Sequence, residues 1–202
     1  MIVFTEQQGS EAWLRLRLGK VTSTRIKRIM TTTWKEVIDE IIAEQEYPEL
    51  PYDDYISDDM QRGLDMEPLA ITHYERTMGV TVDRSAGFIV CEKFPILGYS
   101  PDGLIGSNGG VEVKCPTTKV HVKRLRENKL PNDYKYQIFT AFLVNENLEY
   151  MDFVSFDPRL ERRPIFVHRT YRMEVADQLL EIETQLNKFN TELEKVKSEI
   201  FF

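Results

Sequence analysis

The chain changes character at Gly79, and this change restricts the folds it can adopt. Before Gly79, capping residues and apolar residues spaced three or four apart predict helices. After it come short β-type runs, and a glycine-rich turn at 106–110 joins two of them. We therefore expect a single domain over residues 1–202 of the α/β (α+β) class, with a short central mixed β-sheet flanked by helices.

Local signals place the individual elements. Ser10 is expected to cap a short helix that ends at Gly19, and the hydroxyl-rich segment 22–24 begins a second helix. Further helices are expected at 34–46, 58–77, 117–128, 133–145 and 175–196. Strands are expected at 80–90, 96–99, 111–115, 151–156 and 165–170, and a loop at 47–55.

Composition excludes several classes of protein. A hydrophobic fraction of 42% over 202 residues argues against disorder, and no apolar run approaches the roughly 20 residues that span a bilayer. The first residues lack the basic and apolar regions of a signal peptide. Cys91 and Cys115 lie far apart, which argues against a disulfide framework, a zinc site or an iron–sulfur cluster. A cytoplasmic protein with no membrane partner is expected.

The net charge of −7 at first argues against a nucleic-acid partner, because phosphates attract Lys and Arg. The charge is segregated, however. Residues 36–67 hold 12 acids and one base, and the rest of the chain holds 25 bases and 21 acids. The bases cluster at 15–28 and at 119–129. Since the distribution matters more than the sum, a nucleic-acid partner stays open.

The most informative residues surround the glycine-rich turn. Side chains two apart on a strand share a face, so Glu112 and Lys114 are expected to point the same way. Asp102 is expected on the preceding strand, where it can meet Glu112 at the sheet edge. Two carboxylates and an ammonium suit a hard divalent cation such as Mg²⁺. A water on that cation can hydrolyse a phosphodiester, with Lys114 steadying the developing charge.

Without further information, these residues also allow purely structural interpretations. A surface salt bridge is the common outcome when Glu112 and Lys114 share a strand face. Glu67 would ordinarily be a surface charge on its helix. Arg17 beside a hydroxyl-rich helix start suits an anion, but simple N-capping by Thr22 is the alternative.

Taken in order, these segments resemble the PD-(D/E)xK nuclease superfamily, and more narrowly the phage alkaline exonucleases of the lambda exonuclease (YqaJ-like) type. The resemblance rests on residues 6–24, 62–70, 99–105, 109–118, 134–137 and 155–160. It implies a restriction-endonuclease-like core in a single exonuclease domain. The acidic stretch at 44–59 has no counterpart in the pattern.

The resemblance implies a Mg²⁺ site with two ions, for which Mn²⁺ can substitute. The implied metal ligands are Asp102, Glu112, Glu67 and the carbonyl of Val113. Lys114 would activate the water, and Gln137 would support the site. Together with the acids Asp102, Glu112 and Glu67, these two residues form the implied catalytic set.

The resemblance also implies a pocket for the 5′-phosphate of a DNA end. Its residues would be Arg17, Thr22, Thr24 and Ser100. Lys119 and Lys123 on the basic helix are expected to contact the DNA backbone, with a merely solvated face as the alternative. Met60 is a candidate wedge at the terminal base pair, with core packing as the alternative.

The implied activity is a Mg²⁺-dependent 5′-to-3′ exodeoxyribonuclease. It would degrade one strand of linear double-stranded DNA to mononucleotides and leave a 3′ single-stranded overhang, in phage-type homologous recombination within the host cytoplasm. The implied partners are linear duplex DNA, two further copies in a homotrimer, and a single-strand annealing protein. Two alternatives stay open: an endonuclease of the same superfamily that cuts internally or at branches, and a non-catalytic DNA-binding recombination scaffold.

Overall fold

A computed structural model describes residues 1–31, 34–50 and 58–201, and at 58–60 it describes the helix without the side chains. The helices are α1 (Glu11–Arg17), α2 (Ser23–Ile29), α3 (Trp34–Glu46), α4 (Asp58–Met78), α5 (Thr118–Glu127), α6 (Lys135–Val144) and α7 (Ala176–Ile200), with 3₁₀ turns at Asn132–Tyr134 and Arg172–Val175. The expected helices are thus confirmed to within a few residues. Positions 51–55 of the expected loop lie outside the described residues.

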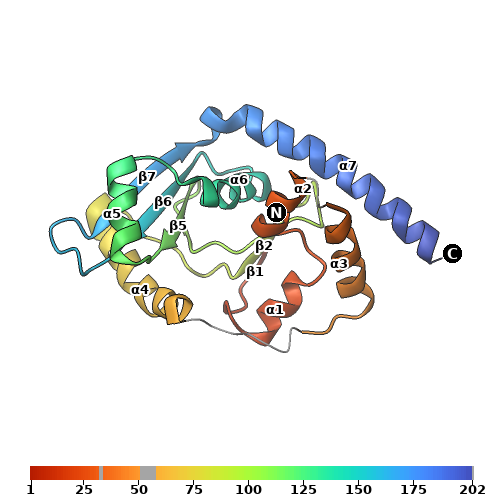
Figure 1. Cartoon of the computed structure of the whole chain (residues 1–202), viewed down its shortest axis with the longest axis horizontal. Coiled ribbons are helices and arrows are strands. Elements are labelled where there is room, and N and C mark those ends of the chain that lie inside the picture. Colours follow the sequence, from red (N-terminus) through yellow and green to blue (C-terminus); the bar gives the residue numbers. More distant parts are fainter. Residues whose placement is uncertain (32–33, 51–57, 202) are drawn as a thin grey trace.

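The strands form two sheets. They are β1 (Ile2–Phe4), β2 (Phe88–Val90), β3 (Gly98–Tyr99), β4 (Gly103–Ile105), β5 (Gly109–Lys114), β6 (Tyr150–Phe156) and β7 (Ile165–Tyr171). The mixed central sheet has the order β4-β5-β6-β7, with β5 and β6 parallel. A smaller antiparallel sheet has the order β1-β2-β3. Helices surround both sheets, which confirms the expected fold class (Figure 1).

Two strand predictions need correction. The hairpin partner of β5 is β4, whereas residues 98–99 pair with β2 in the other sheet. Pro101 separates the two segments because proline has no N–H for a sheet ladder. Asp102 therefore lies just before β4 rather than on a strand. The expected strand at 80–90 is also shorter: apart from a single bridge at Asp83, it pairs only at 88–90.

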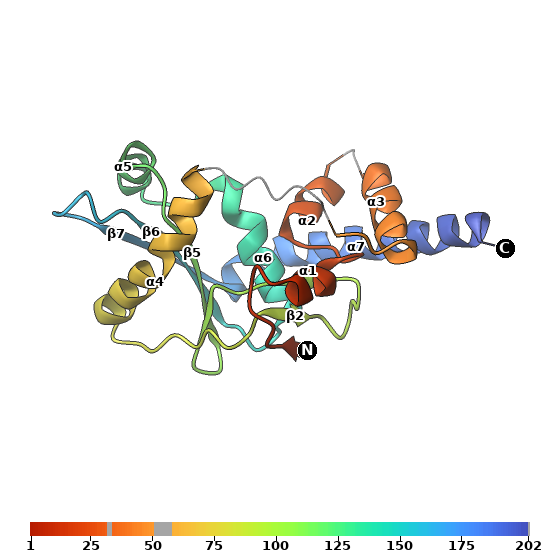
Figure 2. The same cartoon turned by 90° about the horizontal axis from the view of Figure 1, so that it is seen from below.

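The central sheet has a core on each face, and this fixes which way β5 presents its side chains. Val111 and Val113 pack under α4 in one cluster. Phe153, on the neighbouring β6, belongs to the larger cluster with α2, α3, α6 and α7. Glu112 alternates with the valines and pairs with Phe153, so it faces the side on which α6 packs. Figures 1 and 2 show the sheet with α4 and α6 around it. Within the described ranges, none of the helices is long and apolar enough to cross a membrane.

A buried polar group ties the central sheet to α4. Asp152 on β6 is fully buried and accepts two hydrogen bonds from Arg169 of β7, at 2.8 and 2.7 Å. The Tyr74 hydroxyl of α4 donates to the same carboxylate. Burial and this hydrogen bond raise the pKa of Tyr74. Both oxygens of the Asp152 carboxylate accept hydrogen bonds, so the group joins β6, β7 and α4 without leaving an unpaired buried charge.

Asp152→Asn is expected to lower the free energy of unfolding by about 2 kcal/mol, because the fully buried position 152 loses its ion pair with the partly exposed Arg169. Urea denaturation followed by circular dichroism measures this change. Glu181→Gln, at an exposed position of α7, is the matched control and is expected to change stability by less than about 0.5 kcal/mol. Equal losses in both variants would contradict the assignment.

Candidate active site

The β4–β5 hairpin brings Asp102 to the strand that carries Glu112 and Lys114. The Asp102 carboxylate accepts a hydrogen bond from the backbone N–H of Val113 at 2.7 Å. The register of the hairpin places Gly103 opposite Val111, so its continuation brings Asp102 opposite Glu112. This local contact fixes the relative position of the two acids. Glu112 is only 2% exposed, and so it is a buried rather than a surface carboxylate.

The Lys114 ammonium lies at the centre of this group. It donates to the Glu112 carboxylate and to the Val113 carbonyl, the latter at 3.0 Å, and it lies 3.7 Å from Asp102 Oδ2. Three oxygen groups that the sequence proposes as metal ligands therefore converge on one cation. Hard carboxylate and carbonyl oxygens are the donors that Mg²⁺ prefers, so the residues fit such an ion.

The electrostatics of the group favour additional positive charge. Burial and the neighbouring Asp102 raise the pKa of Glu112. Burial alone would lower the pKa of Lys114, but Glu112 and Asp102 outweigh it and raise that pKa, so Lys114 remains an ammonium. The hydroxyl of Tyr99 is buried without a hydrogen-bond partner in the described part of the chain, and burial with the nearby Glu112 raises its pKa. A divalent cation would relieve this crowding of carboxylates.

A second buried acid holds the backbone that follows Lys114. Asp157, at the end of β6, accepts hydrogen bonds from the Thr118 hydroxyl and from Arg62 of α4. Arg62 also donates to the carbonyls of Cys115 and Pro116, both at 2.8 Å. Burial opposes ionisation of Asp157, but hydrogen bonds from Arg159 and Thr118 lower its pKa to about 2. The segment after Lys114 is thus fastened to both α4 and the end of β6.

Glu67 lies near this group without joining it. It sits on α4, which continues through Pro68. Its carboxylate pairs with Arg84 and lines a cavity of about 370 Å³ together with Asp102. Burial and repulsion from Asp102 raise the pKa of Glu67. In the described residues, no three Asp, Glu, His or Cys side chains gather closely enough to hold a metal ion. An ion here would also need the Val113 carbonyl and water.

One cavity of about 180 Å³ unites the two halves of the predicted site. Its walls include the whole predicted phosphate set, which is Arg17, Thr22, Thr24 and Ser100. They also include the predicted catalytic residues Asp102, Glu112, Lys114 and Gln137. Gln137 reaches the cavity from the first turn of α6. An anion held by the first set therefore lies next to the second.

The phosphate side of this cavity is built around Arg17. Its guanidinium donates to the Ser100 hydroxyl at 2.9 Å and stacks on Trp13 with its centre 4.3 Å from the ring. Burial and the nearby Arg25 lower the pKa of Arg17. Arg17 has no carboxylate in ion-pair range anywhere in the described residues. A largely buried guanidinium without a carboxylate suits an incoming anion.

The hydroxyl of Thr22 is not used to cap its helix. Thr22 occupies the N-cap position of α2 with extended backbone, yet its side chain makes no capping hydrogen bond. Simple N-capping is therefore not what the structure shows for this side chain. Because α2 has only seven residues, the case for an anion rests on Arg17 and the hydroxyls rather than on the helix dipole.

Sequence reasoning missed five residues that line this cavity: Gln8, Trp13, Ser23, Gly98 and Tyr99. Trp13 positions the site directly, because its indole N–H donates to Ser100 Oγ and to the Gly87 carbonyl, both at 3.0 Å. Its spacing of four from Arg17 on one helix was an available signal for the stacking. Gln8, whose amide donates to the Pro101 carbonyl at 2.7 Å, offered no such signal.

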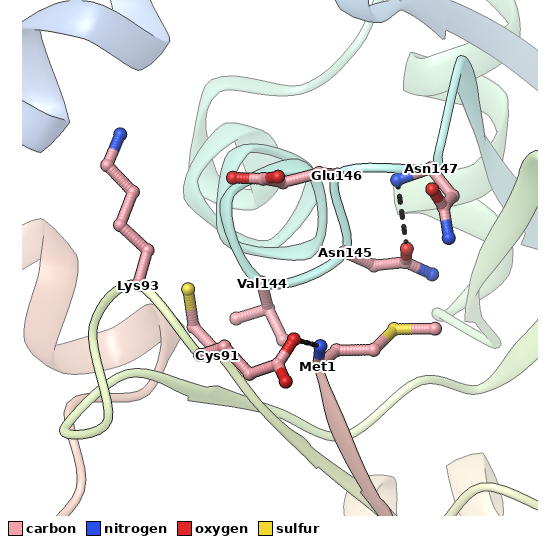
Figure 3. Close-up of a pocket in the computed structure, with 8 residues that line it drawn as sticks. Met1, Cys91, Lys93, Val144, Asn145, Glu146 and Asn147 are labelled. Carbon is pink, nitrogen blue, oxygen red and sulfur yellow. Dashed lines mark hydrogen bonds and ion pairs between the residues drawn. The ribbon is translucent and has the colours of Figure 1, made fainter.

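The predicted DNA contacts lie outside this cavity. Lys119 and Lys123 are exposed on α5, which follows Lys114 in the chain. Met60 lies in the first turn of α4, and its side chain is outside the described part of the structure. A separate cavity of about 390 Å³ lies near the N-terminus, between Cys91–Lys93 and Val144–Asn147 (Figure 3). The Met1 ammonium pairs there with Glu92, and no predicted site residue lines it.

The comparisons with known proteins support a nuclease. Residues 12–147 match the family model of the YqaJ-like viral recombinase domain, and the chain belongs to this family. Among curated proteins, none matches the chain.

Solved structures agree with this assignment. The chain is 31% identical to the alkaline exonuclease LHK-Exo from Laribacter hongkongensis, with a TM-score of 0.83 over 95% of this chain and 96% of that one. LHK-Exo in complex with dAMP gives 31% identity and a TM-score of 0.82 over the same shares. A phage-related exonuclease from Haemophilus somnus 129PT, 16% identical over 90% of this chain and 96% of that one, has a TM-score of 0.59 and shares the fold.

Proposed function

We propose that the protein is a Mg²⁺-dependent exonuclease that digests one strand of linear double-stranded DNA from its 5′ end and leaves a 3′ single-stranded overhang. The observation that carries this proposal is the shared cavity, in which Arg17 and Ser100 adjoin the Asp102–Glu112–Lys114 group. A 5′-phosphate bound by Arg17 would bring the first phosphodiester of that strand within reach of the catalytic group. Mononucleotides are the products of such an arrangement.

Each residue has a distinct part in the proposed reaction. Asp102, Glu112 and the Val113 carbonyl would hold the metal, with Glu67 as a further ligand. When bound, Mg²⁺ would lower the pKa of water and offset charge on the scissile phosphate, with Mn²⁺ as a substitute and two ions as the proposed number. Lys114 Nζ stays protonated beside its carboxylates, so it orients the attacking water and stabilises phosphoryl oxygens as a hydrogen-bond donor. Gln137 supports the water from α6.

A relative supports the product class. LHK-Exo, 31% identical, has been crystallised in complex with dAMP, a 5′-mononucleotide. A mononucleotide carries the phosphate that the Arg17, Thr22, Thr24 and Ser100 side of the cavity is suited to bind. Binding of the same class of molecule is therefore proposed for this chain.

The proposed setting is phage-type homologous recombination in the host cytoplasm. Linear duplex DNA would be the substrate, with Lys119 and Lys123 of α5 on its backbone and Met60 as a wedge at the terminal pair. The enzyme would act as a homotrimer, whose ring would retain the DNA between cleavage steps. A single-strand annealing protein would take over the exposed 3′ strand. Membership of the YqaJ-like family supports this setting.

A strand-labelled digestion assay tests the proposal. With Mg²⁺, linear duplex labelled at the 5′ end of one strand should release its label as a mononucleotide, while a label at the 3′ end should stay on long fragments. Covalently closed circular duplex should stay intact. Cutting of the circle would favour the endonuclease alternative, and no digestion with either Mg²⁺ or Mn²⁺ would favour the non-catalytic scaffold.

A further inference from the structure

Arg84 forms an ion pair with the carboxylate of Glu67. The Arg84 guanidinium pairs with Glu67 Oε1, and the two side chains are 44% and 23% exposed. Both line the cavity of about 370 Å³ that shares Asp102 with the catalytic cavity. The arginine is thus open to a ligand, while the carboxylate it holds lines the same cavity as Asp102. None of the sequence patterns discussed above includes Arg84.

The backbone holds Arg84 firmly beside the hairpin. Asp83 and Leu104 exchange two backbone hydrogen bonds, of 2.7 and 2.8 Å, which join this segment to β4. The Asp83 carboxylate accepts from the Ser85 N–H at 2.8 Å, so it is already engaged. Gly87 donates to the Phe4 carbonyl at 2.8 Å. The segment that carries Arg84 is therefore joined to β4, and Arg84 lines the same cavity as Asp102 with Glu67 as its acidic partner.

Glu67 belongs electrostatically to the metal site even though it does not touch it. Asp102 repels Glu67 and adds to the burial that raises its pKa, while Arg84 and Lys114 act in the opposite direction. The charge of Glu67 in turn contributes to the raised pKa of Glu112. Arg84 therefore cancels a charge that a metal ion beside Asp102 and Glu112 would otherwise attract.

We propose that Arg84 competes with the metal ion for Glu67 and keeps this carboxylate out of the metal site until DNA enters the cavity. The inference rests on the proposed function and names a positioning residue for it. A phosphodiester offers the exposed guanidinium a two-point partner, because Arg binds phosphate through two parallel N–H groups. Transfer of Arg84 to the phosphate frees Glu67 for the metal. Metal and DNA binding are then positively coupled.

The first test measures metal binding without DNA or catalysis. Isothermal titration of Mn²⁺ into Arg84→Gln is expected to show an affinity about fivefold higher than in the wild type. In a Glu67→Gln background, Arg84→Gln should leave the Mn²⁺ affinity unchanged, because the carboxylate for which Arg84 and the metal compete is absent. Arg76→Gln, at an exposed position of α4, is the control for loss of one positive charge. An equal gain in both backgrounds, or no gain, would overturn the proposal.

The second test measures DNA binding in EDTA, where no cleavage occurs. Fluorescence anisotropy of a 5′-phosphorylated duplex should give about fivefold weaker binding for Arg84→Gln than for Arg76→Gln, because one phosphate contact is lost. Equal affinities would contradict the transfer of Arg84 to DNA. If the wild type digests duplex but the metal cycle shows no coupling, the inference fails and the proposed function stands. If the metal cycle shows coupling but no duplex is digested, the proposed function fails and the coupling between Arg84 and Glu67 stands.

Discussion

Lys114→Ala is expected to slow the digestion of linear duplex about 10³-fold while the fold stays intact. The Lys114 ammonium contacts Glu112 and Val113 and lies near Asp102, so its loss would remove charge stabilisation from the proposed reaction site. Removing one preorganised donor from a buried site costs a factor of about 10² to 10³. Loss of the group that orients the attacking water adds to this factor.

Single-turnover release of mononucleotide from 5′-phosphorylated duplex in Mg²⁺ measures this effect. Thermal denaturation of the variant confirms the fold. Lys188→Ala, at an exposed position of α7 far along the chain from the site, is the matched control and should digest at the wild-type rate. Comparable rates for the wild type and Lys114→Ala would remove Lys114 from the chemistry and favour the non-catalytic scaffold.

Local periodicity was enough to predict which way β5 presents its side chains. Alternation on a strand placed Glu112 and Lys114 on one face and the valines on the other, and the structure has this arrangement because α4 and α6 cover opposite faces of the sheet. The cap at Ser10 likewise predicted α1, where its hydroxyl accepts from the Trp13 N–H. Strand alternation and helix capping depend on residues close together in the chain, so both can be predicted from local sequence.

Contacts between distant segments were not predictable in the same way. The pairing of Glu67 with Arg84 joins a helix to an irregular segment across 17 positions, and no period or spacing marks it. The close approach of the segment after β1 to Gly87 is a further example, because a side chain at position 87 would collide with the backbone of Glu6. Such contacts follow from how whole elements pack, so only the family resemblance brought Glu67 into the predicted site, and for Arg17 it favoured one of two open interpretations.

Arg17 is the residue on which the polarity of the proposed reaction depends. Its guanidinium is held by Ser100 and Trp13, so it is already in place before a phosphate arrives. A bidentate contact to a 5′-phosphate would contribute two charge-assisted hydrogen bonds, each worth about 1.5 kcal/mol or more. Arg17→Ala is therefore expected to reduce the preference for 5′-phosphorylated over 5′-hydroxyl ends about 100-fold, since each 1.4 kcal/mol corresponds to a factor of ten.

The ratio of initial digestion rates on the two kinds of end measures this preference. Arg15→Ala is the matched control on the same helix, because Arg15 is exposed and pairs with Glu11. Arg17→Lys should recover only part of the preference, because lysine restores the charge without the planar fork that binds two phosphate oxygens. A preserved ratio in Arg17→Ala would place the 5′-phosphate elsewhere. Equal recovery by lysine would show that charge alone, rather than the two-point contact held by Ser100 and Trp13, selects the DNA end.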